Sequence, residues 1–508
     1  MVVKITRPLR PLTRAIDIPN EAATADPVDE LKQRIAETTE AFRKAPATPE
    51  SFLVLENELA RLGNEAFRQV LQREANRVEP PNKQALPNKV RYHQQTYRIN
   101  KRTPARIATR FGAIVVRSFY YLNEEAGEPG LHPLRLRLGI GAGSATPALL
   151  ERVARMAVDH TPAEVRAWLL KEHGLKWSNT RLRAALAGFR QALQPYVPEL
   201  QKQRLLQWLD AAQRSRGRYR PVLAAGRDGI MTPMRHGAYA EASTATVSVY
   251  DRTRRRLGTI YLGQMPEAKQ TTLSRTLTAL LKATLGAWCE RLPRLAYITD
   301  KGSAPDEYYR QVLNKMKHPR DGQLLEWEWV LDFYHVASYL GKMVEPLFGA
   351  KTKAGAQWFA KMRRWLRDRR QGVSQVLRSA KQYFNQRKLT KAQATEFWKA
   401  YRYLRRHRQW MDYADYRRRG LPIGSGVTEA ACKTVFTQRF KRSGMRWQGE
   451  SGQVILDLRV IHLSGIWDAT FAADLAHREL PEPLDMSHHG SRPGSYRSHR
   501  QARPRIAA

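Results

Sequence analysis

The chain has 508 residues, and its 87 lysines and arginines against 47 aspartates and glutamates give a net charge of +40. Apolar residues make up 42% of the sequence, and this length predicts two or more domains. A charge of this size is usually retained where a polyanion neutralises it, so nucleic acid and an anionic membrane surface are the candidate partners. No apolar run approaches the roughly 20 residues that span a bilayer, which argues against an integral membrane protein.

The N-terminal sequence also lacks the apolar core and cleavage site of a secretory signal. The two cysteines, Cys289 and Cys432, are too few for a disulfide framework or a four-cysteine zinc site. We therefore expect a nucleic-acid-binding protein of a reducing compartment, the cytoplasm.

Residues 1–90 predict a helical region followed by a linker, because apolar residues recur at spacings of three and four from about Asp29 to Asn76. Residues 91–147 alternate as strands do, most clearly over Ile114–Leu122, and predict a β-hairpin region.

Residues 148–216 are expected to form a helical, DNA-binding domain that resembles a helix-turn-helix. Thr161-Pro-Ala-Glu164 is a strong helix start, and Ser178 follows a turn and would cap a second helix that bears Arg181 and Arg183. The second helix of such a unit lies in the major groove of DNA. A plain helical hairpin fits the same residues equally well.

Residues 217–350 change to short β-rich runs. Three consecutive strands, a helix, a strand, a helix and a further strand predict a mixed sheet with the succession seen in ribonuclease-H-like folds. The expected strands are 221–230, 242–250, 257–262, 295–300 and 327–333, and the expected helices are 272–291 and 306–316.

Residues 351–420, here named the basic block, interrupt this order with helices that carry 21 lysines and arginines against four acidic residues. Interleaved aromatic residues fit the core of a helical bundle, while the basic face fits a surface that follows a phosphate backbone, and the two interpretations are compatible. Helices that complete the α/β region are expected over 421–470, and 471–508 is expected to be a basic, flexible tail. The predicted phosphate contacts in the block are Arg363, Arg364, Arg367, Arg369 and Arg370.

Three carboxylates stand on elements where a charge is costly unless it is paired or binds a metal. Asp228 lies on the first strand of the α/β region, Asp300 closes the apolar run Leu295–Thr299, and Glu429 lies in the first turn of a mostly apolar helix. Neighbouring strand ends would bring the two aspartates together, and a helix packed on the sheet would add the glutamate. Hard oxygen ligands that bridge two Mg²⁺ ions suit phosphodiester chemistry, although a lone Asp at a strand end is more often a cap.

Several segments in order resemble prokaryotic insertion-sequence transposases, and more narrowly the Kra-type group with an Asp-Asp-Glu, ribonuclease-H-like core. The resemblance covers about residues 220–465. It rests on Arg227–Met234, Tyr261–Glu267, Ile298–Gly302, Leu331–His335, Pro422–Lys433 and Gln438–Trp447.

The resemblance implies that Asp228, Asp300 and Glu429 hold two Mg²⁺ or Mn²⁺ ions. Asp332 and His335 match an Asp-x-x-His element that is also found in Mutator-like transposases. For His335 a catalytic role, the orientation of a neighbour and contact with DNA all remain open, and for Asp332 we expect a supporting role. Further expected DNA contacts follow the Glu helix, at Lys433, Arg439 and Arg442.

The function so implied is a DNA transposase that binds terminal inverted repeats as a homodimer or higher oligomer and cleaves and joins strands into target DNA with Mg²⁺. It would work in a prokaryotic cytoplasm, at the nucleoid, without a membrane. The alternatives are a ribonuclease-H-like structure-specific endonuclease and a domesticated, non-catalytic DNA-binding protein. Intact carboxylates at all three positions count against the last.

Overall fold

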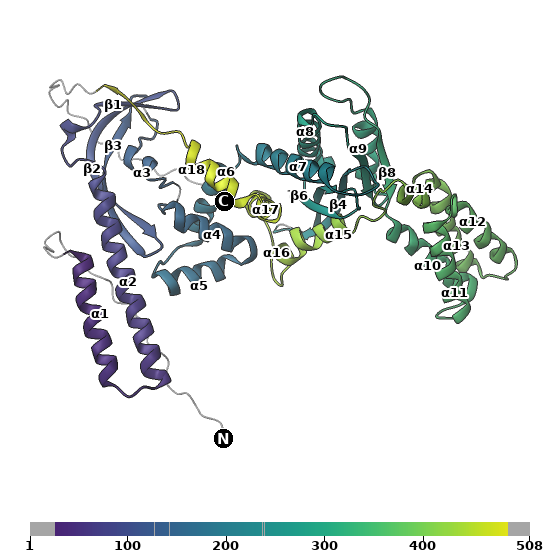
Figure 1. Ribbon diagram of the computed structural model, residues 1–508, viewed down its shortest axis with the longest axis horizontal. Coiled ribbons are helices and arrows are strands. Elements are labelled where there is room, and N and C mark those ends of the chain that lie inside the picture. Colours follow the sequence, from purple (N-terminus) through teal and green to yellow (C-terminus); the bar gives the residue numbers. More distant parts are fainter. Residues whose placement is uncertain (1–25, 126, 142, 236, 238, 486–508) are drawn as a thin grey trace.

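The computed structural model describes residues 26–125, 127–141, 143–235, 237 and 239–485. It is a mixed α/β chain, as predicted, and its strands form one sheet of four strands and one of five. Figure 1 shows an elongated molecule with the smaller sheet and a long helical hairpin toward one end and the larger sheet with a helical bundle toward the other. No helix within the described residues is both long and apolar enough to cross a lipid bilayer.

The N-terminal region is a helical hairpin docked on the four-stranded sheet. The hairpin consists of α1 (Pro27–Lys44) and α2 (Pro49–Arg77), where the helical pattern predicted them. The Nδ2 atom of Asn76 donates to the carbonyl of Val115 at 2.8 Å and holds α2 against β3 (Gly112–Asn123). The other elements here are η1 (Lys83–Ala85), β1 (Lys89–Tyr92), β2 (Gln95–Thr109) and α3 (Pro133–Arg137).

The fourth strand of this sheet corrects the prediction that a flexible tail begins at residue 471. Helix α18 (Trp467–His477) extends into that stretch, and β9 (Glu482–Asp485) pairs antiparallel with β1. The partner strand lies almost 400 residues earlier, and so remote a pairing leaves no local sequence signal. The remainder of the predicted tail, residues 486–508, lies outside the described residues.

A central helical layer contains the predicted helix pair. The first helix begins with the expected capping box at Thr161, and the second is capped by Ser178, whose Oγ accepts from Arg181 N at 3.1 Å. Leu182, Leu186 and Phe189 are buried where the second helix packs on its neighbours. The helices of this layer are α4 (Pro147–Asp159), α5 (Pro162–His173), α6 (Asn179–Leu193) and, from the C-terminal part of the chain, α17 (Gly449–Leu463).

The five-stranded sheet has the order β6-β5-β4-β7-β8, in which the first three strands are antiparallel and the last two run parallel to β4. Helices α7 (Val197–Arg214) and α8 (Thr271–Ala287) contact β5 and β6, so α7 belongs to this sheet although it lies in the stretch 148–216. The strands are β4 (Val222–Pro233), β5 (Tyr239–Tyr250), β6 (Arg256–Gln264), β7 (Arg294–Thr299) and β8 (Trp327–Leu331).

The basic block is a helical bundle continuous with the core of this sheet. Trp358, Phe397 and Tyr413 are buried in the same hydrophobic cluster as the strands, so the interleaved aromatic residues are its core. The block comprises α11 (Lys353–Asp368), α12 (Gly372–Asn385), α13 (Lys391–His407), η4 (Arg408–Trp410) and α14 (Tyr413–Arg418), and the preceding helix α10 (Phe333–Phe348) packs against it. The remaining short elements are η2 (Ala268–Gln270), α9 (Ser303–Gln311) and η3 (Leu313–Lys315).

Candidate active site

Three aspartates lie at one level of three adjacent parallel strands. The last register pair between β4 and β7 is Ala225 with Tyr297, and Asp228 and Asp300 each follow that pair by three residues. The last pair between β7 and β8 is Thr299 with Leu331, so Asp300 and Asp332 follow it by one residue each. Because the carboxyl ends of parallel strands share one edge of a sheet, this register brings the three carboxylates to that edge.

The predicted glutamate reaches the same edge from a helix that packs unusually close to the sheet. Glu429 lies on α15 (Gly426–Ala431), where the hydroxyls of Thr428 and Thr246 on β5 are 2.8 Å apart. A Cβ atom at Gly226 of β4 would lie 2.1 Å from Oγ1 of Thr428, so only glycine leaves room for the helix at this distance.

The mostly apolar helix predicted around Glu429 is not regular along its whole length. It passes into a π-helical segment, η5 (Cys432–Thr437), and ends with α16 (Gln438–Phe440). π-Helical turns occur frequently at functional sites because they redirect side chains within a helix.

All four residues predicted to be catalytic line one cavity of about 300 Å³, which we name the acidic pocket. Asp228, Asp300, Glu429 and His335 come from four separate elements, and Asp332 also lines the cavity. The Glu429 side chain is 66% exposed and lies 3.7 Å from Nζ of Lys433, so it is the most accessible of the three proposed ligands.

The acidic pocket makes ionisation of Asp228 unfavourable. Burial raises the pKa of Asp228 above its ordinary value, and the negative charges of Asp300 and Glu429 raise it further. Two donors oppose this effect: the thiol of Cys432 donates to Oδ2 at 3.1 Å, and the Gly229 amide donates to Oδ1 at 2.8 Å. A cation bound here would relieve the repulsion between the Asp228 carboxylate and its negatively charged neighbours.

Asp332 has a defined supporting role. Its Oδ1 accepts from the backbone N of His335 at 2.5 Å and caps α10, while its Oδ2 accepts from the hydroxyl and the amide of Ser425, the hydroxyl at 2.8 Å. Asp332 therefore ties the helix that carries His335 to the loop that precedes Glu429. An Asp directly before the first turn of a helix is an N-cap signal, so the capping part of this role was readable from the sequence.

His335 lies in the first turn of α10, half-buried. Its ring is 5.5 Å from the ring of Tyr339 and 6.2 Å from that of Tyr403, two tyrosines that stack on each other at 3.8 Å and join α10 to the basic block. The imidazole faces the acidic pocket on one side and this aromatic pair on the other. Orientation of a neighbour and contact with a ligand both remain compatible with this position.

Arg227 is a component of the pocket that the sequence did not single out. It is 2% exposed, and its guanidinium donates to Ser274 Oγ and Gln270 Oε1 at 2.9 Å each and lies 4.6 Å from the centre of the Tyr308 ring. These bonds hold its guanidinium at the start of α8, beside the Tyr308 ring. The only signal was its position next to Asp228.

The predicted basic residues of α11 and the loop after it are all exposed, and one of them lies at the acidic pocket. The guanidinium carbon of Arg363 is 5.7 Å from the ring of Phe333 and 5.8 Å from that of Tyr334, which lines the cavity. The basic face of α11 therefore begins at the pocket. The other exposed members are Arg364, Arg367, Arg369 and Arg370.

The remaining predicted DNA contacts divide into exposed side chains and side chains engaged in packing. Arg183 is exposed on α6, and Lys433 is exposed near Glu429. Arg181 donates to the carbonyls of Gly143 and Ser144 at 2.9 and 3.2 Å, so its guanidinium serves the packing of α6.

Arg439 and Arg442 are likewise engaged inside the protein. Arg439 is 1% exposed and donates to the carbonyl of Ala157 at 3.2 Å, and burial lowers its pKa to about 10. Arg442 forms a bidentate pair with Glu164, and its hydrogen bonds to this carboxylate, together with those from Thr161, lower the pKa of Glu164 to about 2. For these two residues contact with DNA would require the loss of internal bonds.

The donor set of the acidic pocket fits a hard divalent cation, since carboxylate oxygens are the ligands that Mg²⁺ prefers. Among the described residues, no three His, Cys, Asp or Glu side chains are grouped tightly enough to form a metal cluster as they stand. The pocket thus supplies carboxylate ligands. The repulsion that Asp300 and Glu429 exert on Asp228 gives a reason for a cation to bind there. No protein-family model and no curated protein sequence matches this chain.

Proposed function

We propose that the protein is a DNA transposase with a ribonuclease-H-like core in which Asp228, Asp300 and Glu429 are the catalytic carboxylates. The observation that carries this proposal is the convergence of three acids, from β4, from the end of β7 and from α15, on one pocket at the carboxyl edge of the parallel strands. The strand order β6-β5-β4-β7-β8, antiparallel then parallel, supports the ribonuclease-H-like assignment.

In this proposal the three carboxylates hold Mg²⁺ ions at the edge of the sheet. When bound, such ions activate an attacking water or 3′-hydroxyl and stabilise the leaving oxygen of the phosphodiester. Gly229 and Cys432 orient the carboxylate of Asp228 by donating to its two oxygens, and Asp332 fixes the elements that carry His335 and Glu429. This chemistry needs no covalent protein–DNA intermediate, so no tyrosine or serine nucleophile is required.

The basic block supplies the charge that would hold DNA at this pocket. Its excess of basic over acidic residues lies in a bundle packed directly on the sheet, and Arg363 reaches the edge of the acidic pocket. Each phosphate neutralised by a lysine or arginine releases counterions, so binding through this face is expected to weaken steeply with salt.

The proposal is tested with the DNA that flanks the open reading frame, searched for paired inverted repeats. Duplexes that end in those repeats, incubated with the protein, Mg²⁺ and a target plasmid, are expected to become joined to the plasmid. Asp228→Asn, Asp300→Asn and Glu429→Gln should each abolish cleavage and joining while binding of the duplex persists.

The same assay separates the alternatives. Cleavage without joining, even from pre-cleaved ends, would favour a structure-specific endonuclease, and binding without either reaction would favour a non-catalytic DNA-binding protein. Full activity in any one carboxylate variant would remove that residue from the site.

A further inference from the structure

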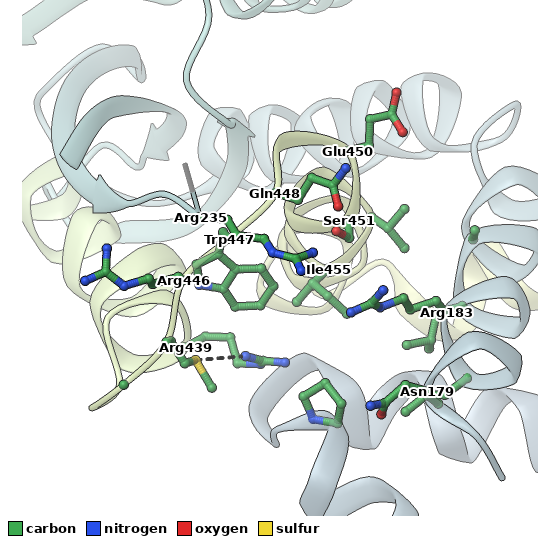
Figure 2. Close-up of a pocket in the computed structure, with 17 residues that line it drawn as sticks. Asn179, Arg183, Arg235, Arg439, Arg446, Trp447, Gln448, Glu450, Ser451 and Ile455 are labelled. Atoms are coloured by element: carbon green, nitrogen blue, oxygen red, sulfur yellow. Dashed lines mark hydrogen bonds between the residues drawn. The ribbon is translucent and has the colours of Figure 1, made fainter. Parts of the chain in front are cut away.

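A cavity larger than the acidic pocket lies between the central helical layer and the end of β4. It has a volume of about 830 Å³, within the range of pockets that take a small organic ligand. We name it the arginine pocket, because Arg183 of α6, Arg235 after β4, and Arg439 and Arg446 near α16 line it together with Trp447. Figure 2 shows Trp447 between Arg446 on one side and Arg183, which extends toward it from α6, on the other.

Three of the four arginines of this pocket are available to a ligand. Arg183 and Arg235 are exposed, and within the described residues neither guanidinium makes a hydrogen bond or an ion pair. Arg446 makes one long hydrogen bond, to the Gly237 carbonyl at 3.5 Å. Glu450 is the single acidic residue that lines the cavity, so the pocket carries a net positive charge. Convergent arginines with unused donors recognise phosphate.

The aromatic wall is held in a fixed position. The Nε1 atom of Trp447 donates to the carbonyl of Phe440 at 2.9 Å, and the guanidinium of Arg439 lies 5.0 Å from the ring centre. The indole is half-exposed, and Leu182, Leu186 and Ile455 add an apolar floor. A rigid indole beside an apolar floor suits a flat, unpaired base, whose contact with an aromatic side chain is independent of sequence.

The arginine pocket is connected to the acidic pocket by β4. The amide of Arg235 donates to the carbonyl of Trp447 at 2.8 Å, and the amide of Trp447 donates to that of Pro233 at 3.1 Å, so the end of β4 forms one wall. Asp228 precedes Arg235 by seven residues, which at about 3.3 Å per residue is about 23 Å. A DNA strand covers this length in about seven nucleotides at roughly 3.4 Å each.

From these observations we infer that the arginine pocket binds one unpaired nucleotide of the DNA substrate, with its base against Trp447 and its phosphate on Arg183 and Arg235. The inference rests on the proposed function in that it takes DNA as the substrate. It adds that the protein prefers DNA in which a base has left the stack, about seven nucleotides from the site of cleavage. Removing a base from a duplex costs energy, so DNA with a base already unpaired binds best.

The test compares two fluorescent duplexes of arbitrary sequence, one fully paired and one with a single unpaired nucleotide, by fluorescence anisotropy. The full-length protein is expected to bind the duplex with the unpaired nucleotide about tenfold more tightly, in line with the stacking of one base on an aromatic ring. Trp447→Ala should abolish this preference and leave the affinity for the paired duplex within about twofold. Trp208→Ala is the matched control, because Trp208 is also half-buried against an arginine, with Arg204 at 5.1 Å, but lies on α7 outside the pocket.

Arg183→Ala provides a second variant in case Trp447→Ala fails to fold, since the Arg183 side chain is exposed. It should reduce the preference severalfold. A 2-aminopurine at the unpaired position should be quenched on binding to the native protein and to the Trp208 variant, and not by the Trp447 variant.

Two results would overturn this inference and leave the proposed function standing. One is equal binding of both duplexes by the native protein, and the other is an unchanged preference for the unpaired nucleotide in both the Trp447 and the Arg183 variant. No binding of either duplex would contradict the proposed function as well, which keeps the two failures distinct.

Discussion

At the scale of single residues, Asp228 combines a proposed catalytic role with a cost to stability. Its pKa in the folded protein is raised above the ordinary 3.8 by burial and by Asp300 and Glu429. Folding therefore favours the protonated form of Asp228. The stability that this form contributes to the folded protein is fully present below the unfolded pKa and is lost as the pH rises through the folded pKa. At neutral pH the ionised carboxylate then destabilises the metal-free protein.

Asp228→Asn is accordingly expected to raise the free energy of unfolding at neutral pH by about 0.5–2 kcal/mol while it abolishes cleavage. Urea denaturation without divalent cations measures the first effect. The gain should shrink when the pH is lowered toward the unfolded pKa, and Mg²⁺ should stabilise the native protein but not the variant. A variant that is less stable than the native protein at every pH would contradict this account of the pocket.

Cys432 offers a second test at this scale, because its thiol donates to Asp228 and thereby lowers the pKa of that carboxyl. Cys432→Ala removes the donor, so the decline of Mg²⁺-dependent cleavage on acidification should begin at a higher pH. Cys432→Ser keeps a donor and should retain the native profile. Identical pH–rate profiles for all three proteins would show that the thiol does not orient or tune Asp228.

At the scale of elements, the close approach of α15 to β4 determines where Glu429 lies. Gly226→Ala would place a Cβ atom 2.1 Å from Thr428 Oγ1 and 3.0 Å from the carbonyl of Ile298, so the helix must move away from the sheet. We expect a loss of about 1–3 kcal/mol of stability and a large loss of cleavage, as for other overpacked sites.

The double variant Gly226→Ala with Thr428→Ala separates the helix position from general damage. Removing the Thr428 hydroxyl removes the nearest clashing atom, so the two changes should be less harmful together than the sum of their single effects. Thermal denaturation and the cleavage rate of all four proteins complete the cycle. Additive losses would mean that this contact does not set the position of Glu429.

The basic face of α11 makes a prediction about DNA binding. Reversal of Arg363, Arg364 and Arg367 to glutamate should lower the affinity for duplex DNA and reduce the slope of its logarithm against that of salt by about 2–3, roughly 0.9 for each lost phosphate contact. The control is Arg43→Glu with Lys44→Glu on α1. Both side chains are about three-quarters exposed, and both lie far from α11 in the sequence. An unchanged slope in the α11 variant would leave this face as a solvated surface.

At the scale of the whole molecule, the structure shows where the excess of positive charge lies. A large part of it lies in the basic block, whose aromatic core is continuous with that of the five-stranded sheet, so the charge and the acidic pocket belong to one body. A second group of arginines surrounds Trp447 at the carboxyl end of β4, beyond Asp228. Under the proposed function, DNA would run between the two pockets along β4 and the helix that carries Glu429.

Local sequence patterns predicted where these helices and strands lie better than they predicted which elements pack or pair with them. The apolar run before Asp300 placed β7 to within a residue, and the capping signals placed α5 and α6, because these depend on neighbours in sequence. The pairing of β9 with β1 and the packing of α7 on the sheet depend on contacts between distant segments, which no local pattern records.

The candidate site shows the same division. Asp228, Asp300, Glu429 and His335 were selected from sequence and lie around one cavity. The thiol that orients Asp228 and the glycine that admits α15 emerged only from three-dimensional contacts, because Cys432 lies far from Asp228, and Gly226 far from Thr428, in the sequence.

The central claim is that three carboxylates from three elements form one cation site, and calorimetric titration of the full-length protein with Mn²⁺ tests it without DNA. The native protein and the remote control Glu40→Gln on α1 are expected to bind Mn²⁺, whereas Asp228→Asn, Asp300→Asn and Glu429→Gln should each weaken binding by at least about tenfold, as expected for the loss of a ligand. Equal Mn²⁺ binding by the native protein and all three carboxylate variants would contradict the claim.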